Sequence, residues 1–250
     1  MNAPLAGKVA LVTGAGKNIG RAIALRLAAD GAAIVVNGRS DEAAIKAVAE
    51  EITAAGGRAM AYRADITKPE EVAAMAAAVA AQFGGVDILV TNAGLRRQTS
   101  FLDMSFAEWR EILSDALDGA FIITQAFAQQ MIARGGGSII GLSGISTHVG
   151  TPNRAHVSAS KSGLEGLMRA LAVELAPKGI RANCVAPGAV DTVRGASAGS
   201  MPSTLADNGI PMRRRASVAE IADVVRMLAG PEGGYITGQT IHVNGGAFLT

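Results

Sequence analysis

The strongest constraint on the fold is a regular alternation of short apolar runs with longer helical patterns along all 250 residues. The runs lack polar alternation, which is typical of strands buried on both faces of a parallel sheet. Consecutive parallel strands need right-handed crossover connections, so this order predicts an α/β fold with helices on both faces of one doubly wound sheet. The seven predicted strands of this parallel sheet are Val9–Thr13, Ala33–Asn37, Ala59–Arg63, Ile88–Asn92, Ser138–Ser143, Ala182–Ala186 and Thr240–Val243.

No linker interrupts the alternation, so residues 1–250 are predicted to form a single domain. Hydrophobic residues make up 49% of the chain and charged residues 18%, as in globular proteins. The least regular stretch, about 193–215, is rich in Gly, Ser and Pro. We expect this stretch to be a flexible substrate flap rather than a domain boundary.

Three predicted helices begin with the spacing of a capping box, in which Ser or Thr is followed three residues later by Glu. The pairs are Thr67 with Glu70, Ser105 with Glu108, and Ser217 with Glu220.

Composition excludes several classes of protein. A formal net charge of only +2 gives no basic surface that indicates a nucleic-acid partner. Cys184 is the only cysteine, so we expect no intrachain disulfide, no metal site and a buried, inert thiol. No secretory leader or apolar stretch long enough to span a bilayer is visible, which predicts a cytoplasmic protein without a membrane partner.

A glycine-rich turn follows the first predicted strand and opens a helix. Its sequence is Thr13-Gly14-Ala15-Gly16-Lys17-Asn18-Ile19-Gly20. Glycine permits the tight turn and lets backbone N–H groups approach a pyrophosphate, whose charge is favoured at a helix N-terminus. Within a βαβ unit this turn predicts a Rossmann-type dinucleotide-binding domain.

The end of the second strand indicates which dinucleotide binds. An acidic residue there would accept hydrogen bonds from the adenosine ribose, but the chain reads Asn37-Gly38-Arg39-Ser40 and has no carboxylate before Asp41. Arg39 and Lys17 are suited to flank a 2′-phosphate. We therefore predict NADP(H); the alternative is that both are solvated surface cations.

Taken together, these features resemble the short-chain dehydrogenases/reductases, and the resemblance covers essentially the whole chain. One departure is Asn18, which stands where that family usually has its middle glycine; Asn tolerates unusual φ values. The motifs that carry the resemblance are Thr13-Gly14 with Gly20, Asp65, Asn92-Ala93-Gly94, Ser158-Ala159-Ser160-Lys161, Pro187-Gly188 with Thr192, and Gly238 with Val243-Asn244-Gly245-Gly246. The cofactor-binding residues, from the turn or implied by the resemblance, are Gly14, Gly16, Lys17, Asn18, Ile19, Gly20, Arg39, Asp65, Ile66, Asn92, Ala93, Gly94, Lys161, Pro187, Gly188, Val190 and Thr192.

The catalytic pattern of that family is incomplete in this chain. The family uses a tyrosine as general acid–base, a lysine four residues later, a serine thirteen residues earlier and a helix asparagine. Lys161 keeps the lysine position, but the tyrosine, serine and asparagine positions hold Val157, Gly144 and Ala116. These three residues cannot transfer protons.

One interpretation is that neighbouring residues take over. His156 precedes the vacant tyrosine position, and Ser143 lies thirteen residues before His156, which reproduces the serine–tyrosine spacing one residue early. Histidine titrates in the range suited to this chemistry, but one residue along a helix turns a side chain by roughly 100°. The predicted catalytic set is Lys161, His156 and Ser143, with His148 as a further possibility; the alternative for His156 is a subunit contact.

Another interpretation is that the protein does not reduce a carbonyl. The chain is then a non-redox lyase or isomerase on the same scaffold, or a non-catalytic NADP(H)-binding protein. The predicted function remains an NADP(H)-dependent oxidoreductase acting on a small carbonyl or alcohol.

Arginines indicate the charge of that small-molecule substrate. Arg96 and Arg97 follow the Asn92-Ala93-Gly94 motif and Arg213–Arg215 close the predicted flap, which favours an anionic substrate unless these are solvated loop charges. Asp115 and Asp118 flank Ala116 and are expected at a subunit interface, with the pocket as the alternative. The resemblance implies a homotetramer or homodimer built on the two long helices, Ser105–Arg134 and about Pro152–Ala176, and on the C-terminal segment.

Overall fold

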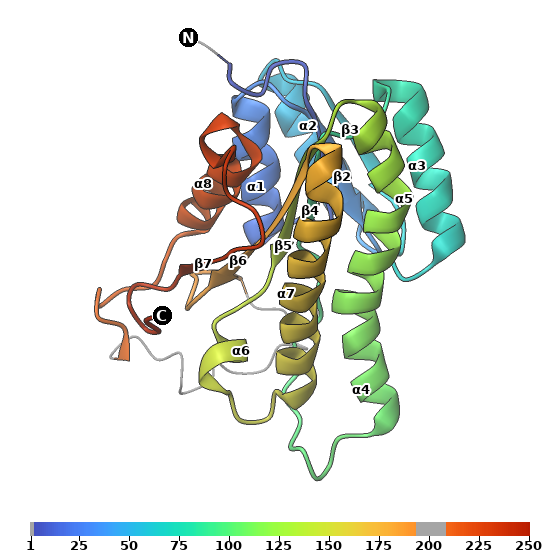
Figure 1. The fold of residues 1–250 in the computed structure, drawn as a ribbon. Helices are drawn as coiled ribbons and strands as arrows, with labels where there is room; N and C mark the ends of the chain where they lie inside the picture. Colours follow the sequence, from blue (N-terminus) through green and yellow to red (C-terminus); the bar gives the residue numbers. More distant parts are fainter. Residues whose placement is uncertain (1–2, 194–208) are drawn as a thin grey trace.

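The computed structural model describes residues 3–193 and 209–250 and contains one seven-stranded sheet (Figure 1). The strand order is β3-β2-β1-β4-β5-β6-β7, and every neighbouring pair is parallel. The predicted fold class is confirmed. The strands are β1 Val9–Val12, β2 Ala33–Gly38, β3 Ala59–Arg63, β4 Ile88–Thr91, β5 Gly137–Leu142, β6 Ile180–Pro187 and β7 Thr240–Val243.

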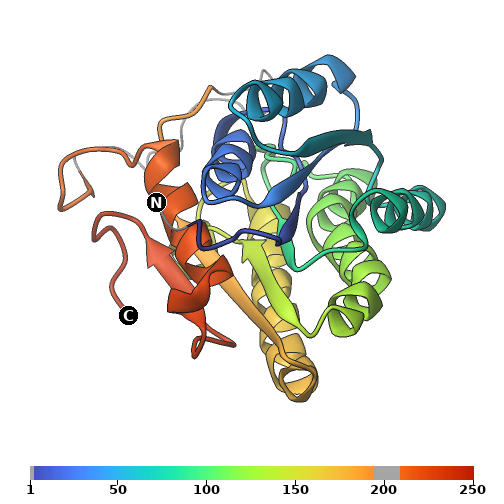
Figure 2. The same ribbon diagram turned by 90° about the horizontal axis from the view of Figure 1, so that it is seen from above.

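Helices cover both faces of the sheet, as the view from above shows (Figure 2). One apolar cluster joins the sheet to α1, α2 and α8, and a second joins it to α3, α5 and α7. Burial of these two apolar faces is the main force that holds the layers together. The helices are α1 Asn18–Ala29, α2 Glu42–Ala54, α3 Pro69–Phe83, α4 Phe106–Leu113, α5 Gly119–Ala133, α6 Ser146–Val149, α7 Ala155–Leu175 and α8 Val218–Ala229.

The strand order reverses at β1, which pairs with β2 on one side and β4 on the other. In open parallel sheets the crevice at such a switch point, beyond the carboxyl ends of the strands, is where ligands bind. This topology places the turn after β1 beside the segment after β4.

The three predicted helix starts have different outcomes. The full capping box of Ser217 and Glu220 is confirmed. Ser105 caps α4 by accepting from the Glu108 N–H, which is one half of the predicted capping box; the Glu108 carboxylate accepts from the Thr99 hydroxyl. The prediction for Thr67 is wrong, because α3 begins at Pro69 after Lys68 and the Thr67 hydroxyl donates instead to Asp65 (2.8 Å).

The long helix predicted over Ser105–Arg134 is interrupted. A π-helical turn, Ser114–Asp118, separates α4 from α5, and Ala116 lies within it. Such turns are rare and frequently occur at functional sites. The short helix α6 was not predicted from the sequence.

Cys184 has the inert environment that the sequence predicts. It is fully buried in β6, and burial raises the pKa of its thiol to about 12.

Among the described residues, no helix combines the length and the apolar character needed to cross a membrane. Most of the predicted flap, residues 194–208, lies outside the described residues.

Candidate active site

The turn after β1 offers backbone donors at the start of α1. The N-cap residue Lys17 makes no side-chain capping hydrogen bond, and the first turn of the helix carries no acidic residue. The first N–H groups of a helix have no partner within it, so an uncapped N-terminus is suited to an anion such as a pyrophosphate. Gly14 adopts a φ of +61°, which glycine reaches without strain.

Asn18 adopts the left-handed backbone conformation that the position of the missing glycine requires, with φ at +50°. Its side-chain amide makes two hydrogen bonds to the backbone of Val193. The Nδ2 group donates to the carbonyl oxygen (2.9 Å), and Oδ1 accepts from the N–H (3.0 Å). Asn18 therefore replaces glycine without backbone conflict and ties the segment after β6 to the glycine-rich turn.

Asn92 joins the turn after β1 to the segment after β4. Its Nδ2 donates to the carbonyl oxygens of Thr13 (2.9 Å) and Gly14 (3.1 Å). The Thr13 hydroxyl in return accepts from the N–H groups of Asn92 and Ala93, both at 3.0 Å. Two segments predicted to bind the cofactor are thus fixed to each other.

Arg39 lies at the carboxyl end of β2, half-exposed, with its Nη1 3.0 Å from Asp115 Oδ1. Asp115 is buried, and this burial raises the pKa of its carboxyl despite the charges of Arg39 and Lys161. Asp115 is thus buried within the subunit against Arg39. The carboxylate of Asp65 binds the N–H and hydroxyl of Thr67, and Ile66 is buried.

Lys161 is almost fully buried on α7, and its Nζ donates to the Leu142 carbonyl oxygen at 2.6 Å. The same nitrogen lies 3.2 Å from the position that a Cβ on Gly94 would take. Burial, and then the positive charge of Arg96, lower the pKa of Lys161 to about 8. The ammonium therefore loses its proton near the upper end of the physiological range.

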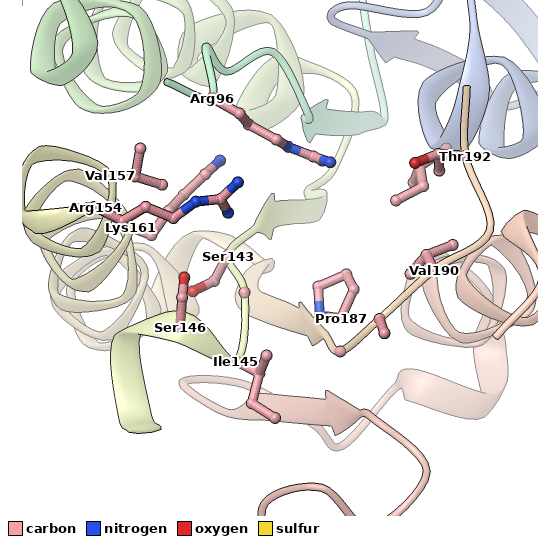
Figure 3. A pocket seen from close by; sticks show the side chains of 14 residues that line it. Arg96, Ser143, Ile145, Ser146, Arg154, Val157, Lys161, Pro187, Val190 and Thr192 are labelled. Atoms are coloured by element: carbon pink, nitrogen blue, oxygen red, sulfur yellow. The ribbon is translucent and has the colours of Figure 1, made fainter. Parts of the chain in front are cut away.

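A pocket opens at this end of the sheet, and Figure 3 shows Arg96, Arg154 and Lys161 extending toward the same space. In the described part of the chain, none of the residues lining this pocket is a carboxylate. The lining residues are Ile19, Arg96, Ser143, Gly144, Ile145, Ser146, Arg154, Val157, Lys161, Pro187, Gly188, Ala189, Val190 and Thr192.

The structure brings together two members of the predicted catalytic set, Ser143 and Lys161, and leaves His156 outside the pocket. His156 is fully buried, with Nε2 3.3 Å from Glu108 Oε1 and Nδ1 accepting from the Val157 N–H at 3.0 Å. The reason is helical geometry, because Val157 faces the pocket and the preceding residue is turned by about 100° toward α4.

Of the predicted cationic rim, only Arg96 lines the pocket. Arg97 forms an ion pair with Glu111 on an exposed surface, and Arg214 pairs with Glu220 at 2.6 Å. Arg213–Arg215 lie around a separate hollow beside Asp191.

Arg154, which lines the pocket, and Glu165, which contacts the pocket-lining Ser143, are residues that the sequence analysis missed. Arg154 is the buried N-cap residue of α7 and follows Asn153, whose φ is +62°. Glu165 lies one turn after Lys161 and is buried against Ser143 and His148. A charged residue four positions after Lys161, on the same helix face, is the signal that identifies Glu165.

The residues present fit a dinucleotide. A Cβ on Gly20 would lie 2.3 Å from the Gly14 carbonyl oxygen, so only glycine allows α1 to pack this closely on the turn. Six predicted cofactor residues line the pocket itself: Ile19, Lys161, Pro187, Gly188, Val190 and Thr192.

Comparisons with known proteins agree with this geometry. A family model described as enoyl-(acyl carrier protein) reductase matches residues 14–247. The chain is 40% identical over 243 residues to the 3-oxoacyl-[acyl-carrier-protein] reductase FabG of Staphylococcus epidermidis, covering 97% of this chain and 99% of that protein. The chain belongs to the short-chain dehydrogenase/reductase family.

Solved structures of other members of the short-chain dehydrogenase/reductase family have the same fold. A putative short-chain alcohol dehydrogenase from Sinorhizobium meliloti superimposes with a TM-score of 0.91 at 36% identity, covering 99% of this chain and 98% of that one. A short-chain dehydrogenase from Burkholderia cenocepacia in complex with NADP gives 0.89 at 35%, covering 98% and 99%. The predicted family is confirmed, and the chain is an oxidoreductase of this family.

Proposed function

We propose that this oxidoreductase uses NADP(H) to interconvert a carbonyl and an alcohol on a small substrate that carries an anionic group. The observation that carries the proposal is the pocket of Figure 3, where Arg96, Arg154 and Lys161 approach one space that no described carboxylate lines. Hydrogen bonds from these cations to a carboxylate are roughly twice as strong as neutral ones. The pocket therefore favours an anion over a neutral substrate of the same shape.

NADP(H) as the cofactor is supported by the end of β2 and by a relative. Arg39 stands there in place of a carboxylate, and the Burkholderia cenocepacia relative is described in complex with NADP. When bound, the nicotinamide accepts or donates a hydride. The family resemblance implies that Lys161 binds the nicotinamide ribose and that Val190 and Thr192 bind the carboxamide. All three residues line the pocket.

Replacing Arg39 with glutamine is expected to weaken NADPH binding by roughly 10- to 100-fold, because a charge-assisted hydrogen bond contributes about 1.5–3 kcal/mol. NADH affinity is expected to change by less than about threefold, since NADH has no 2′-phosphate. Titration calorimetry with both nucleotides measures this, and Arg63→Gln, an exposed arginine 3.8 Å from Glu42, is the control. Equal losses for both nucleotides would contradict the assignment of Arg39.

The proposed function is tested by NADPH absorbance with matched pairs of substrates. Small 2-oxo and 3-oxo acids are compared with their methyl esters, and a 3-oxoacyl thioester is included because relatives are named for that substrate class. We expect the acids to be reduced with a kcat/KM at least about tenfold above their esters. Equal rates for acid and ester would overturn the anionic preference, and product formation without NADPH oxidation would favour the non-redox alternative.

The neighbouring arginines Arg96 and Arg97 offer a matched pair of variants. Arg96→Gln removes a cation from the pocket and is expected to raise the KM for the acid roughly 10- to 100-fold, with little effect on the ester. Arg97→Gln removes only an exposed ion pair with Glu111 and is expected to leave both KM values within about twofold. Equal effects of the two variants would show that the pocket does not bind the anion through Arg96.

Of the predicted acid–base set of Ser143, His156 and Lys161, the proposed function retains Ser143 and Lys161. Val157, Gly144 and Ala116 offer no transferable proton, so another group must exchange the proton of the substrate oxygen. His156 faces Glu108 instead of the pocket, and the variant His156→Gln tests it below. The homotetramer or homodimer stays a prediction.

A further inference from the structure

Glu165 is a buried carboxylate that belongs to none of the family motifs found in the sequence. Its side chain is 6% exposed, and three groups meet at its Oε1 atom. The Ser143 hydroxyl donates to it, the Thr147 hydroxyl lies at 3.4 Å, and His148 Nε2 lies at 3.0 Å. A buried carboxylate is costly without such partners, so this arrangement depends on all of them.

These contacts form a continuous series from the pocket toward solvent. Ser143 lines the pocket at the end of β5, Glu165 follows on α7, and His148 on α6 has a side chain that is 24% exposed. The His148 ring also packs against His242 (4.6 Å between ring centroids) and Phe248 (5.2 Å). These contacts therefore begin at the pocket and end at a partly exposed histidine.

We propose that Glu165 is the proton acceptor and donor of this enzyme and acts on the substrate oxygen through the Ser143 hydroxyl. This inference rests on the proposed carbonyl–alcohol interconversion, and it replaces the missing tyrosine with a relay from Ser143 through Glu165 to His148.

In the direction of alcohol oxidation the step balances as follows. The substrate O–H bond breaks and its proton binds Ser143 Oγ, while the original hydroxyl proton of Ser143 moves to Glu165 Oε1. The C=O bond forms as the hydride, with its electron pair, leaves the same carbon for the oxidised nicotinamide. Glu165 passes its proton to His148 Nε2 when the ring holds its own proton on Nδ1, and Nδ1 then releases that proton to solvent; reduction runs the same path in reverse.

Other charged and titratable groups surround Glu165. Lys161 and Arg169 lie on its own helix, one turn to either side. His148 approaches from α6, Cys184 from β6 and His242 from β7. Burial, and then the charge of His148, lower the pKa of His242, while the charge of Glu165 opposes this shift.

The test combines a double-mutant cycle with pH profiles of alcohol oxidation. Glu165→Gln and Ser143→Ala are each expected to lower kcat by roughly 10²- to 10⁴-fold, and the double variant no further, because both act in one transfer. If the relay operates, the fall of kcat/KM at low pH, the acidic limb of the profile, is expected to disappear in Glu165→Gln. Glu174→Gln, at an exposed site on the same helix, is the control.

A second readout does not depend on activity. The chain has only three histidines, so the ring signals of His148, His156 and His242 are separable by NMR. In cofactor-free Glu165→Gln we expect the His148 signals to move and those of His156, which contacts Glu108, to stay in place. Unmoved His148 signals would overturn the contact on which the relay depends.

The remaining outcomes distinguish the relay from its alternatives and from the proposed function. Additive losses in the double variant, or an acidic limb retained in Glu165→Gln, would overturn the relay and leave the proposed function intact. Loss of that limb in His156→Gln alone would overturn it in favour of His156. Absence of NADP(H) turnover in the wild-type protein with every substrate would overturn the proposed function and the relay together.

Discussion

Replacing Gly20 with alanine is expected to weaken NADP(H) binding by at least about 100-fold. The added Cβ would lie 2.3 Å from the Gly14 carbonyl oxygen, 2.5 Å from Asn92 Nδ2 and 3.0 Å from Ala15 Cα. None of these is the far end of a flexible side chain, since Asn92 is itself held by the carbonyl oxygens of Thr13 and Gly14. The start of α1 must therefore move away from the turn, and its N–H groups no longer point toward the predicted pyrophosphate site.

Titration calorimetry with NADPH measures the effect of Gly20→Ala, and we expect an affinity loss of at least about 100-fold, close to 3 kcal/mol. Gly166→Ala is the matched control, because a Cβ at this helical glycine of α7 meets nothing within 4 Å. It is expected to keep NADPH affinity and to raise thermal stability, since alanine favours a helix over glycine by about 0.8–1 kcal/mol. NADPH affinity within threefold of wild type in Gly20→Ala would contradict this account of the turn.

Replacing Lys161 with methionine is expected to lower kcat/KM by roughly 10²- to 10³-fold. Methionine keeps much of the apolar stem but removes both the charge in the pocket and the hydrogen bond to Leu142. Lys178→Met, at an exposed site beyond the end of the same helix, is the control and is expected to leave kcat/KM unchanged.

The pH dependence gives Lys161 a signature of its own. Its pKa is about 8, so the ammonium is charged below that pH and neutral above it. For wild type we expect the KM of an anionic substrate to rise as the pH passes through about 8, because the lysine loses its positive charge. Lys161→Met is expected to show a high KM on both sides of this pH, and a persisting rise near pH 8 would assign the titration to another group.

The sequence by itself determined the architecture and was enough to predict where the cofactor binds. Short, continuous apolar runs between helical patterns are enough to predict a parallel sheet, because strands that are buried on both faces are apolar on both sides. The glycine-rich turn, the missing acid after β2 and the register of Lys161 against Val157 depend on local spacing, which the sequence states directly. The loss of the tyrosine, serine and asparagine of the family is equally visible there.

Only the tertiary structure decided which polar side chains lie near the positions of the missing groups. Spacing alone favoured His156, but the phase of α7 turns this ring toward Glu108. Glu165 meets Ser143 and His148 because β5, α6 and α7 converge, and Arg154 reaches the pocket from an irregular helix start. Such contacts join residues up to 22 positions apart, and their geometry depends on helix phase and loop path, which local spacing does not specify.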